Sequence, residues 1–133
     1  MQQLMNLKLL VSIFTSGFLV LALHIHALSS FLYWRYWWFD NAVHFLGGFT
    51  IALVVLFYAE RFSYLKQARQ VKFLIIALVG VLIASIFWEV FEYEAGIVLV
   101  ASNYALDTFL DITMGLMGAL IGGIYAHKVR QLL

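Results

Sequence analysis

Long apolar runs alternate with short polar stretches along the whole chain. Each run is about as long as a membrane-spanning helix, which needs roughly 20 residues to cross about 30 Å of hydrocarbon. The four runs cover Leu7–Leu28, Asn41–Tyr58, Val71–Tyr93 and Leu106–Tyr125. Because little chain lies between them, the pattern predicts an all-α integral membrane bundle of four transmembrane helices, forming a single domain over residues 1–133.

The composition supports a protein embedded in lipid. Of the 133 residues, 65% are hydrophobic and 11% are charged, and the mean hydropathy is +0.96. Soluble domains are typically about half apolar and about a quarter charged. The absence of cysteine excludes disulfides, thiolate metal ligands and cysteine nucleophiles. A net charge of +1 without any basic run gives no reason to expect a nucleic-acid partner.

The positive charges gather at one end of the predicted bundle. Seven of the eight Lys and Arg residues lie near the termini or between the second and third runs: Lys8, Arg61, Lys66, Arg69, Lys72, Lys128 and Arg130. Because Lys and Arg are enriched on the cytoplasmic side of membranes, we expect both termini to be cytoplasmic. The chain is then a multi-pass protein of the cell membrane, with its first and third connections facing the periplasm or exterior.

The acidic residues gather at the opposite end. Six of the seven lie near the outer ends of the second, third and fourth runs: Asp40, Glu89, Glu92, Glu94, Asp107 and Asp111. Side chains three or four residues apart share a helix face, so the motifs D-x3-H, E-x2-E and D-x3-D each present two polar groups together. Glu94 is expected to point elsewhere, into headgroup water. The spacing predicts an acidic site built by three helices just below the outer membrane surface.

Some of these polar residues also suit ordinary roles. Asp40 and Asp107 each open a helix, where an N-cap explains an aspartate as well as a functional site does. His24 and His26 are two residues apart, so at most one of them faces the interior, and both suit a membrane interface.

Three residues about one turn deeper resist an ordinary explanation: His44, Glu89 and Asp111. An Asp at the centre of a membrane helix costs about 2.5–3.5 kcal/mol on insertion scales, and such groups are usually paired. No Lys or Arg lies at this depth in a predicted span, and Arg35 is the only base at this end. Either a metal cation binds here, or the carboxylates share protons.

We interpret the cluster as a divalent-metal site. Carboxylates and an imidazole without sulfur suit Mg²⁺, Mn²⁺, Fe²⁺ or Zn²⁺. The expected metal ligands are Asp40, His44, Glu89, Glu92, Asp107 and Asp111. Such a site favours a metal-dependent hydrolase or transferase, in which Glu92 or Asp107 acts as general base. Its shallow depth favours a lipid or lipid-linked envelope substrate.

The alternative function is a cation- or proton-binding or transport protein that uses a proton-sharing carboxylate cluster. Against transport, few polar residues occupy the cytoplasmic halves of the predicted spans. A haem between His24 and His44 is disfavoured, because acidic surroundings suit its propionates poorly.

Two segments border the predicted site. The stretch FLYWRYWWFD, residues 31–40, concentrates aromatic side chains that are typical of a membrane interface. It also suits the rim of a lipid site in which Arg35 binds an anionic head group of the substrate. The third connection, AGIVLVASNYA, is an apolar outer loop that suits the membrane surface above the acids.

Small residues recur after His44 and along the fourth run: Gly47, Gly48, Gly115, Gly118, Ala119, Gly122 and Gly123. Small residues spaced four apart let helices approach closely. We expect them to draw the acid-bearing helices together, and the same faces also suit a homo-oligomer.

Three blocks resemble a known family. FDNAVHFLGGF, WEVFE and DTFLDITMGLMGA are similar to the signature blocks of the YjdF-like inner-membrane proteins, and more distantly to VanZ-like proteins. The resemblance implies a small multispan protein whose motif positions fall on Asp40, His44, Glu89, Glu92, Asp107 and Asp111. The VanZ-like likeness implies a role in the cell envelope and names no reaction.

Overall fold

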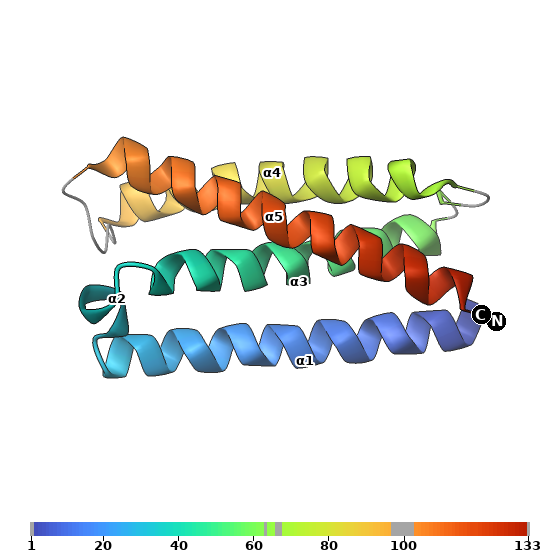
Figure 1. The fold of residues 1–133 in the computed structure, drawn as a ribbon, viewed down its shortest axis with the longest axis horizontal. Coiled ribbons are helices and arrows are strands. Elements are labelled where there is room, and N and C mark those ends of the chain that lie inside the picture. Colours follow the sequence, from blue (N-terminus) through green and yellow to red (C-terminus); the bar gives the residue numbers. More distant parts are fainter. Residues whose placement is uncertain (1, 63, 66–67, 97–102, 133) are drawn as a thin grey trace.

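The chain forms a bundle of long helices, with one short helix at one end, in a computed structural model (Figure 1). The structure describes residues 2–62, 64–65, 68–96 and 103–132, with side chains from residue 6 onward. The elements are α1 (Gln2–Ser29), α2 (Leu32–Arg35), α3 (Phe39–Arg61), α4 (Gln70–Ala95) and α5 (Tyr104–Gln131). All elements in the described residues are helical, which confirms the predicted all-α class.

The helices α1, α3, α4 and α5 are long and apolar enough to cross a membrane, as predicted. Their spanning windows have mean hydropathies between 1.6 and 2.5. Each helix extends past the apolar run that indicated it; α5, for example, continues from Tyr125 through Lys128 to Gln131. Lys, Arg and Gln are good helix formers, so a helix continues into the polar interface where an apolar pattern ends.

The two termini lie at the same end of the bundle, beside the connection from α3 to α4 (Figure 1). The other end carries α2, the end of α4 and the start of α5. Arg61, Lys72 and Lys128 therefore lie at the end with the termini, whereas Asp40 and Glu89 lie toward the other. The separation of charge expected from the sequence is present in the fold.

The helix ends show which residues cap the acid-bearing helices. The Asn103 side chain accepts a hydrogen bond from the backbone N–H of Leu106 at 3.3 Å and caps α5, whereas Trp38 precedes α3 without a capping bond. Interpreting Asp40 and Asp107 as N-caps is therefore wrong, because each helix begins before its aspartate. Both aspartates lie inside the first helical turn.

Glycines bring α3 and α5 into close contact. A Cβ at Gly48 would overlap the backbone of Gly115, and one at Gly118 would overlap the backbone carbonyl of Phe45. The close approach needs hydrogen at these positions. Gly48 lies one turn after His44, and Gly115 lies one turn after Asp111, so this contact sets the distance between the two polar side chains.

Gly47 does not share this packing role. No atom lies within 4 Å of where its Cβ would be, and the residue lines a cavity instead. The prediction that both Gly47 and Gly48 pack against a neighbour is therefore wrong for Gly47. Successive residues of a helix lie about 100° apart around its axis, so when Gly48 faces α5, Gly47 faces away from it.

The middle and the terminal end of the bundle form a dense core. Leu53, Leu56 and Phe73 are at most 1% exposed. Toward the termini, the Arg130 Nη1 lies 3.3 Å from Glu60 Oε1 and donates to the carbonyl oxygen of Leu65. The Arg130 guanidinium also lies 5.4 Å from the centre of the Phe73 ring. This end therefore pairs the charge of its buried acid with a base from the same chain.

Candidate metal centre

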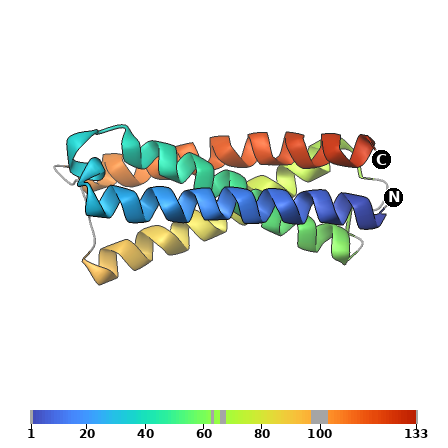
Figure 2. The same cartoon turned by 90° about the horizontal axis from the view of Figure 1, so that it is seen from below.

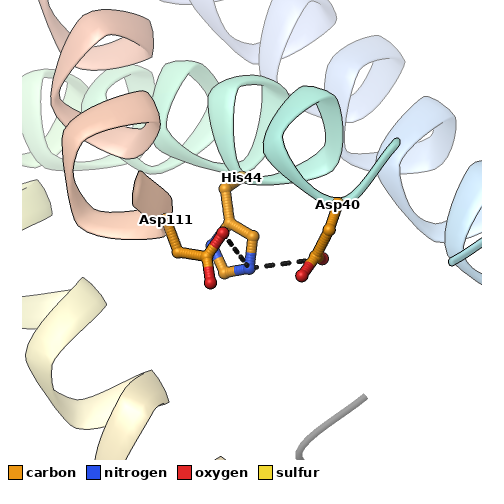
Figure 3. A group of neighbouring side chains, drawn as sticks. All are labelled: Asp40, His44 and Asp111. Carbon is orange, nitrogen blue, oxygen red and sulfur yellow. Dashed lines mark ion pairs between the residues drawn. The ribbon is translucent and has the colours of Figure 1, made fainter. Parts of the chain in front are cut away.

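One histidine lies between two carboxylates at the end of the bundle that carries α2 (Figure 3). Asp40 and His44 are one turn apart on α3, and Asp111 comes from α5. The His44 Nε2 lies 3.5 Å from Asp40 Oδ1 and 3.7 Å from Asp111 Oδ1. Ligands about 2.1 Å from one tetrahedral ion lie about 3.4 Å from each other, so these separations suit a shared cation.

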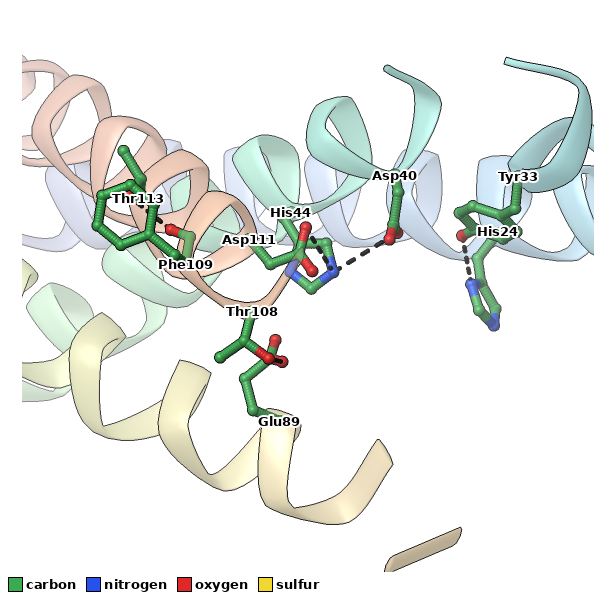
Figure 4. A network of polar contacts seen from close by, with 9 residues as sticks. All are labelled: His24, Tyr33, Asp40, His44, Glu89, Thr108, Phe109, Asp111 and Thr113. Carbon is green, nitrogen blue, oxygen red and sulfur yellow. Dashed lines mark hydrogen bonds and ion pairs between the residues drawn. The ribbon is translucent and has the colours of Figure 1, made fainter. Parts of the chain in front are cut away.

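Glu89 contributes a deeply buried carboxylate from α4. Its residue is 6% exposed, and the hydroxyl of Thr108 donates to its Oε2 at 2.8 Å (Figure 4). The phenol of Tyr104 donates to its backbone carbonyl at 3.2 Å. The other carboxylate oxygen, Oε1, is buried without a hydrogen-bond partner in the described structure. Burying such an oxygen without a partner costs free energy, and a cation at this position would remove that cost.

The described acids and His44 form two overlapping groups of ligand atoms. One group contains Asp40, His44 and Asp111, and the other contains His44, Glu89 and Glu92. Within each group the ligand atoms all lie within 4.8 Å of one another. The donors are carboxylate oxygens and an imidazole nitrogen, which suit hard or borderline divalent ions. His44 belongs to both groups, so it is the centre of the arrangement.

A cavity of about 680 Å³ opens beside these groups. Asp40, His44 and Glu92 contribute polar atoms to its wall, and His24 and Tyr33 line it from α1 and α2. Away from these residues the wall is mainly apolar and includes Leu21, Val43, Ile51, Ala84, Phe87 and Phe91. The candidate centre is therefore accessible from an apolar space.

His24 and Tyr33 form a hydrogen-bonded pair at the wall of this cavity, with 2.7 Å between Nδ1 and the phenol oxygen (Figure 4). Burial, followed by the charges of Asp40 and Glu92, raises the pKa of the Tyr33 phenol above its ordinary value. The pair occupies Nδ1 of His24 and leaves its Nε2 for a second hydrogen bond.

The structure brings together most of the residues that the sequence selected, but not all. Asp40, His44, Glu89, Glu92 and Asp111 belong to the two groups, whereas Asp107 belongs to neither. Arg35 is exposed and does not line the cavity, and Glu94 is exposed as expected. The apolar outer loop lies largely outside the described residues, at 97–102.

Sequence reasoning missed some of the polar partners. It left open which of His24 and His26 faces inward; His24 lines the cavity, and His26 is exposed. It overlooked Tyr33 among the interfacial aromatics, and it overlooked Thr108. A signal for Thr108 was present, because it lies three residues before Asp111 and shares its helix face.

The comparisons with known proteins place the chain in a family. Residues 3–131, which include nearly all of the four spanning helices, match the family described as predicted membrane protein DUF2238. The match agrees with the YjdF-like resemblance and does not test the likeness to VanZ-like proteins. Among curated proteins and solved structures, nothing matches the chain. The chain is a member of the DUF2238 family of predicted membrane proteins.

Proposed function

We propose that this membrane protein binds a divalent cation through His44 and the carboxylates around it, and acts as a metal-dependent hydrolase or transferase. The observation that carries the proposal is that the buried Oε1 of Glu89 has neither a hydrogen-bond partner nor a Lys or Arg beside it in the described structure. This oxygen belongs to a carboxylate of the group that contains His44 and Glu92. Several converging carboxylates and a neutral imidazole can together act as ligands of one cation.

The electrostatics of the membrane support the same conclusion. Among the described residues, no Lys or Arg forms an ion pair with Asp40, Glu89 or Asp111. Acids within a spanning helix are costly and are usually paired or coordinated. Since His44 carries at most one positive charge, it does not balance the carboxylates that surround it. A divalent ion supplies the remaining positive charge.

The cavity supports a catalytic role over a purely structural one. A divalent ion bound here would polarise a phosphoryl or acyl oxygen, or lower the pKa of a bound water. Glu92 lines the cavity and belongs to the second ligand group. It is therefore better placed than Asp107 to act as general base. Asp40 and His44 then hold the ion from the cavity wall, and Asp111 holds it from the buried side.

The charge distribution supports an outward-facing site. The end with the termini carries most of the Lys and Arg, so we infer that it faces the cytoplasm. The candidate centre then lies at the periplasmic or exterior face of the cell membrane. A substrate that is a lipid or linked to a lipid of the envelope fits this depth.

A second candidate is a proton-sharing cluster, and the position of His44 favours it. A protonated imidazole would form ion pairs with both Asp40 and Asp111 over the observed distances. Such a site would bind protons or monovalent cations without a divalent metal ion. A transport path across the bilayer fits less well, because Leu53, Leu56 and Phe73 fill the core toward the termini.

Metal analysis of protein purified in detergent separates the two candidates. We expect about one divalent ion per chain in the wild type, and a loss of about tenfold or more in affinity for Glu89→Gln and Asp111→Asn. Glu94→Gln is the matched control, because it removes an exposed charge from the same helix as Glu89. Its metal content should equal that of the wild type. A wild type that binds no divalent ion overturns the metal proposal and favours the proton-sharing cluster.

A further inference from the structure

The cavity beside the metal centre extends well beyond the polar groups. Beyond the polar end its walls come from three of the long helices: Gly17 and Leu21 of α1, Gly47 and Ile51 of α3, and Ala84 and Phe87 of α4. In the described residues α1 packs on α3, and no Cα atom of α1 lies within 8 Å of a Cα atom of α4. Figure 2 shows the end of α4 diverging from α1 at the end of the bundle that carries α2. The cavity therefore lies in the space between α1 and α4, over the face of α3.

The depth of the cavity matches one leaflet of a bilayer. Asp40 and Ile51 both line it and are eleven residues apart on α3, which is a rise of about 16 Å along the helix. The hydrocarbon of a bilayer is about 30 Å thick, so one leaflet contributes about 15 Å. Polar groups line one end of this length, and apolar side chains line most of the rest. The cavity has the polarity and the depth of a single lipid.

We propose that this cavity binds one hydrocarbon tail of a membrane lipid, whose polar head lies at the acid–His groups. This lipid is the substrate class of the proposed function. The contacts of its head rest on that function, whereas the tail site rests on the cavity alone. The tail would lie against Leu21, Ile51 and Phe87, and the head would reach His44 and Glu92.

The size of the cavity selects a lipid tail over a helix from a second copy or a partner. A spanning helix is about 30 Å long. The cavity follows α3 for only about 16 Å, from Asp40 to Ile51. Its surroundings in a membrane are the tails of neighbouring lipids, which reach it through the space between α1 and α4. An apolar wall offers no hydrogen bonds, and a hydrocarbon tail needs none.

Glycine keeps the cavity open at its centre. No atom lies within 4 Å of a Cβ at Gly47, so the missing side chain is the space that a tail would occupy. Gly48, the next residue, is buried against α5 and serves packing. The two adjacent glycines on α3 therefore have different roles: Gly48 packs against α5, and Gly47 leaves space in the cavity.

His24 places an imidazole near the head of the lipid, on the wall formed by α1. Tyr33 occupies its Nδ1, which leaves Nε2 for another partner. The ring lines the same cavity as Asp40 and Glu92. A head group with phosphate or carboxyl oxygens would accept from His24 while it contacts a cation at His44.

Photocrosslinking in vesicles tests the proposal. The protein is reconstituted into phosphatidylethanolamine and phosphatidylglycerol vesicles that contain a phospholipid with a diazirine on its tail, and the labelled residues are mapped by mass spectrometry. We expect labelling concentrated on cavity residues such as Leu21, Val43 and Ile51. Gly47→Leu fills the cavity without meeting another atom at its Cβ, and should lower this labelling about tenfold.

Matched variants make the result specific. Ala22→Leu adds the same side chain to an exposed position of α1, and should leave the labelling of the cavity unchanged. Ala84→Leu fills the cavity from α4 and repeats the test if Gly47→Leu does not fold. Labelling spread evenly over exposed residues such as Phe14 and Phe18, or unchanged in both filled variants, overturns the proposal.

The outcome is separable from that of the metal proposal. If the wild type binds no divalent ion but Gly47→Leu still removes the cavity labelling, the tail site stands and the metal proposal fails. If metal binds and the labelling is evenly spread, the metal centre stands and the tail site fails. Glu94→Gln should keep the labelling, because this exposed carboxylate lines neither the cavity nor the acid–His groups.

Discussion

Glu60 and Glu89 are buried to nearly the same extent at opposite ends of the bundle, with 5% and 6% of their surfaces exposed. What lies beside each carboxylate differs. Glu60 has the guanidinium of Arg130 at 3.3 Å, whereas Glu89 has one hydroxyl from Thr108 and shares its surroundings with other acids. Equal burial therefore hides two different electrostatic situations.

At the basic end the chain itself supplies a cation to the buried acid. The Arg130 guanidinium lies 3.3 Å from Glu60 Oε1, although this oxygen, like Oε1 of Glu89, has no hydrogen-bond partner in the described structure. Arg130 also contacts the carbonyl of Leu65 and the ring of Phe73. At the acidic end, the described carboxylates face each other and one histidine. The comparison teaches that a buried acid in a membrane helix points to a ligand only when no base of the chain reaches it.

The largest effect on stability should come from removing the ion pair at the basic end. Arg130→Met leaves Glu60 buried without its cation, and breaking a buried ion pair costs about 3–5 kcal/mol. The Arg130 side chain is 24% exposed, so solvent screening lowers the expected loss to about 2–4 kcal/mol. Thermal unfolding in detergent, followed by helical circular dichroism, measures it.

Lys128→Met is the control for this variant, because it removes an exposed positive charge from the same helix and should cost little. Adding Glu60→Gln to Arg130→Met should recover part of the loss, since the unpaired charge is gone. Equal stability of Arg130→Met and the wild type would contradict the view that this end depends on its ion pair.

Neighbouring glycines on α3 provide the next contrast. Gly48→Ala forces a methyl group into the backbone of Gly115, and such overpacking costs about 1–3 kcal/mol. It should also weaken metal binding. The added methyl group pushes α3 and α5 apart at Gly48 and Gly115, and His44 and Asp111 lie one turn from that contact. Gly47→Ala meets no atom within 4 Å and should leave stability unchanged or raise it by up to about 1 kcal/mol. Unfolding midpoints and metal content of the two variants are compared side by side.

Much of the fold and part of the site follow from the sequence, because the bilayer restricts what a chain can do. Long apolar runs in lipid must be helical, which fixed the positions of α1, α3, α4 and α5 to within a few residues. Helical spacing put Asp40 with His44 and joined Asp111 to the face of Gly115. Both results rest on local periodicity, which a single helix already determines.

What the sequence could not supply depends on how helices are rotated and placed against each other. The motif D-x3-D gives Asp107 and Asp111 one face, yet only Asp111 reaches His44. Gly47 and Gly48 look alike in a pattern of small residues, and only the position of α5 tells them apart. The cavity needs a gap between α1 and α4, and no pattern within either helix encodes that gap.

The smallest effect on stability is expected at Glu89, and its sign decides how the acidic end is understood. In metal-free protein, Glu89→Gln replaces a buried oxygen that has no partner by an amide, which donates toward the neighbouring carboxylates. Stability should then stay within about 1 kcal/mol of the wild type or rise, because an unsatisfied buried acceptor is removed. Added divalent metal should stabilise the wild type and leave the variant unchanged, since a ligand stabilises only the state that binds it.

Thermal unfolding with a chelator and then with metal separates these contributions, and Glu94→Gln again controls for the loss of a charge on α4. If metal-free Glu89→Gln lost as much stability as Arg130→Met, the carboxylate of Glu89 would already be satisfied within the chain. The two ends of the bundle would then be alike, and the acids around His44 would need no cation. A loss confined to the metal-bound protein instead assigns the difference between Glu60 and Glu89 to the partner each requires: a base of the chain for one, and an ion from outside it for the other.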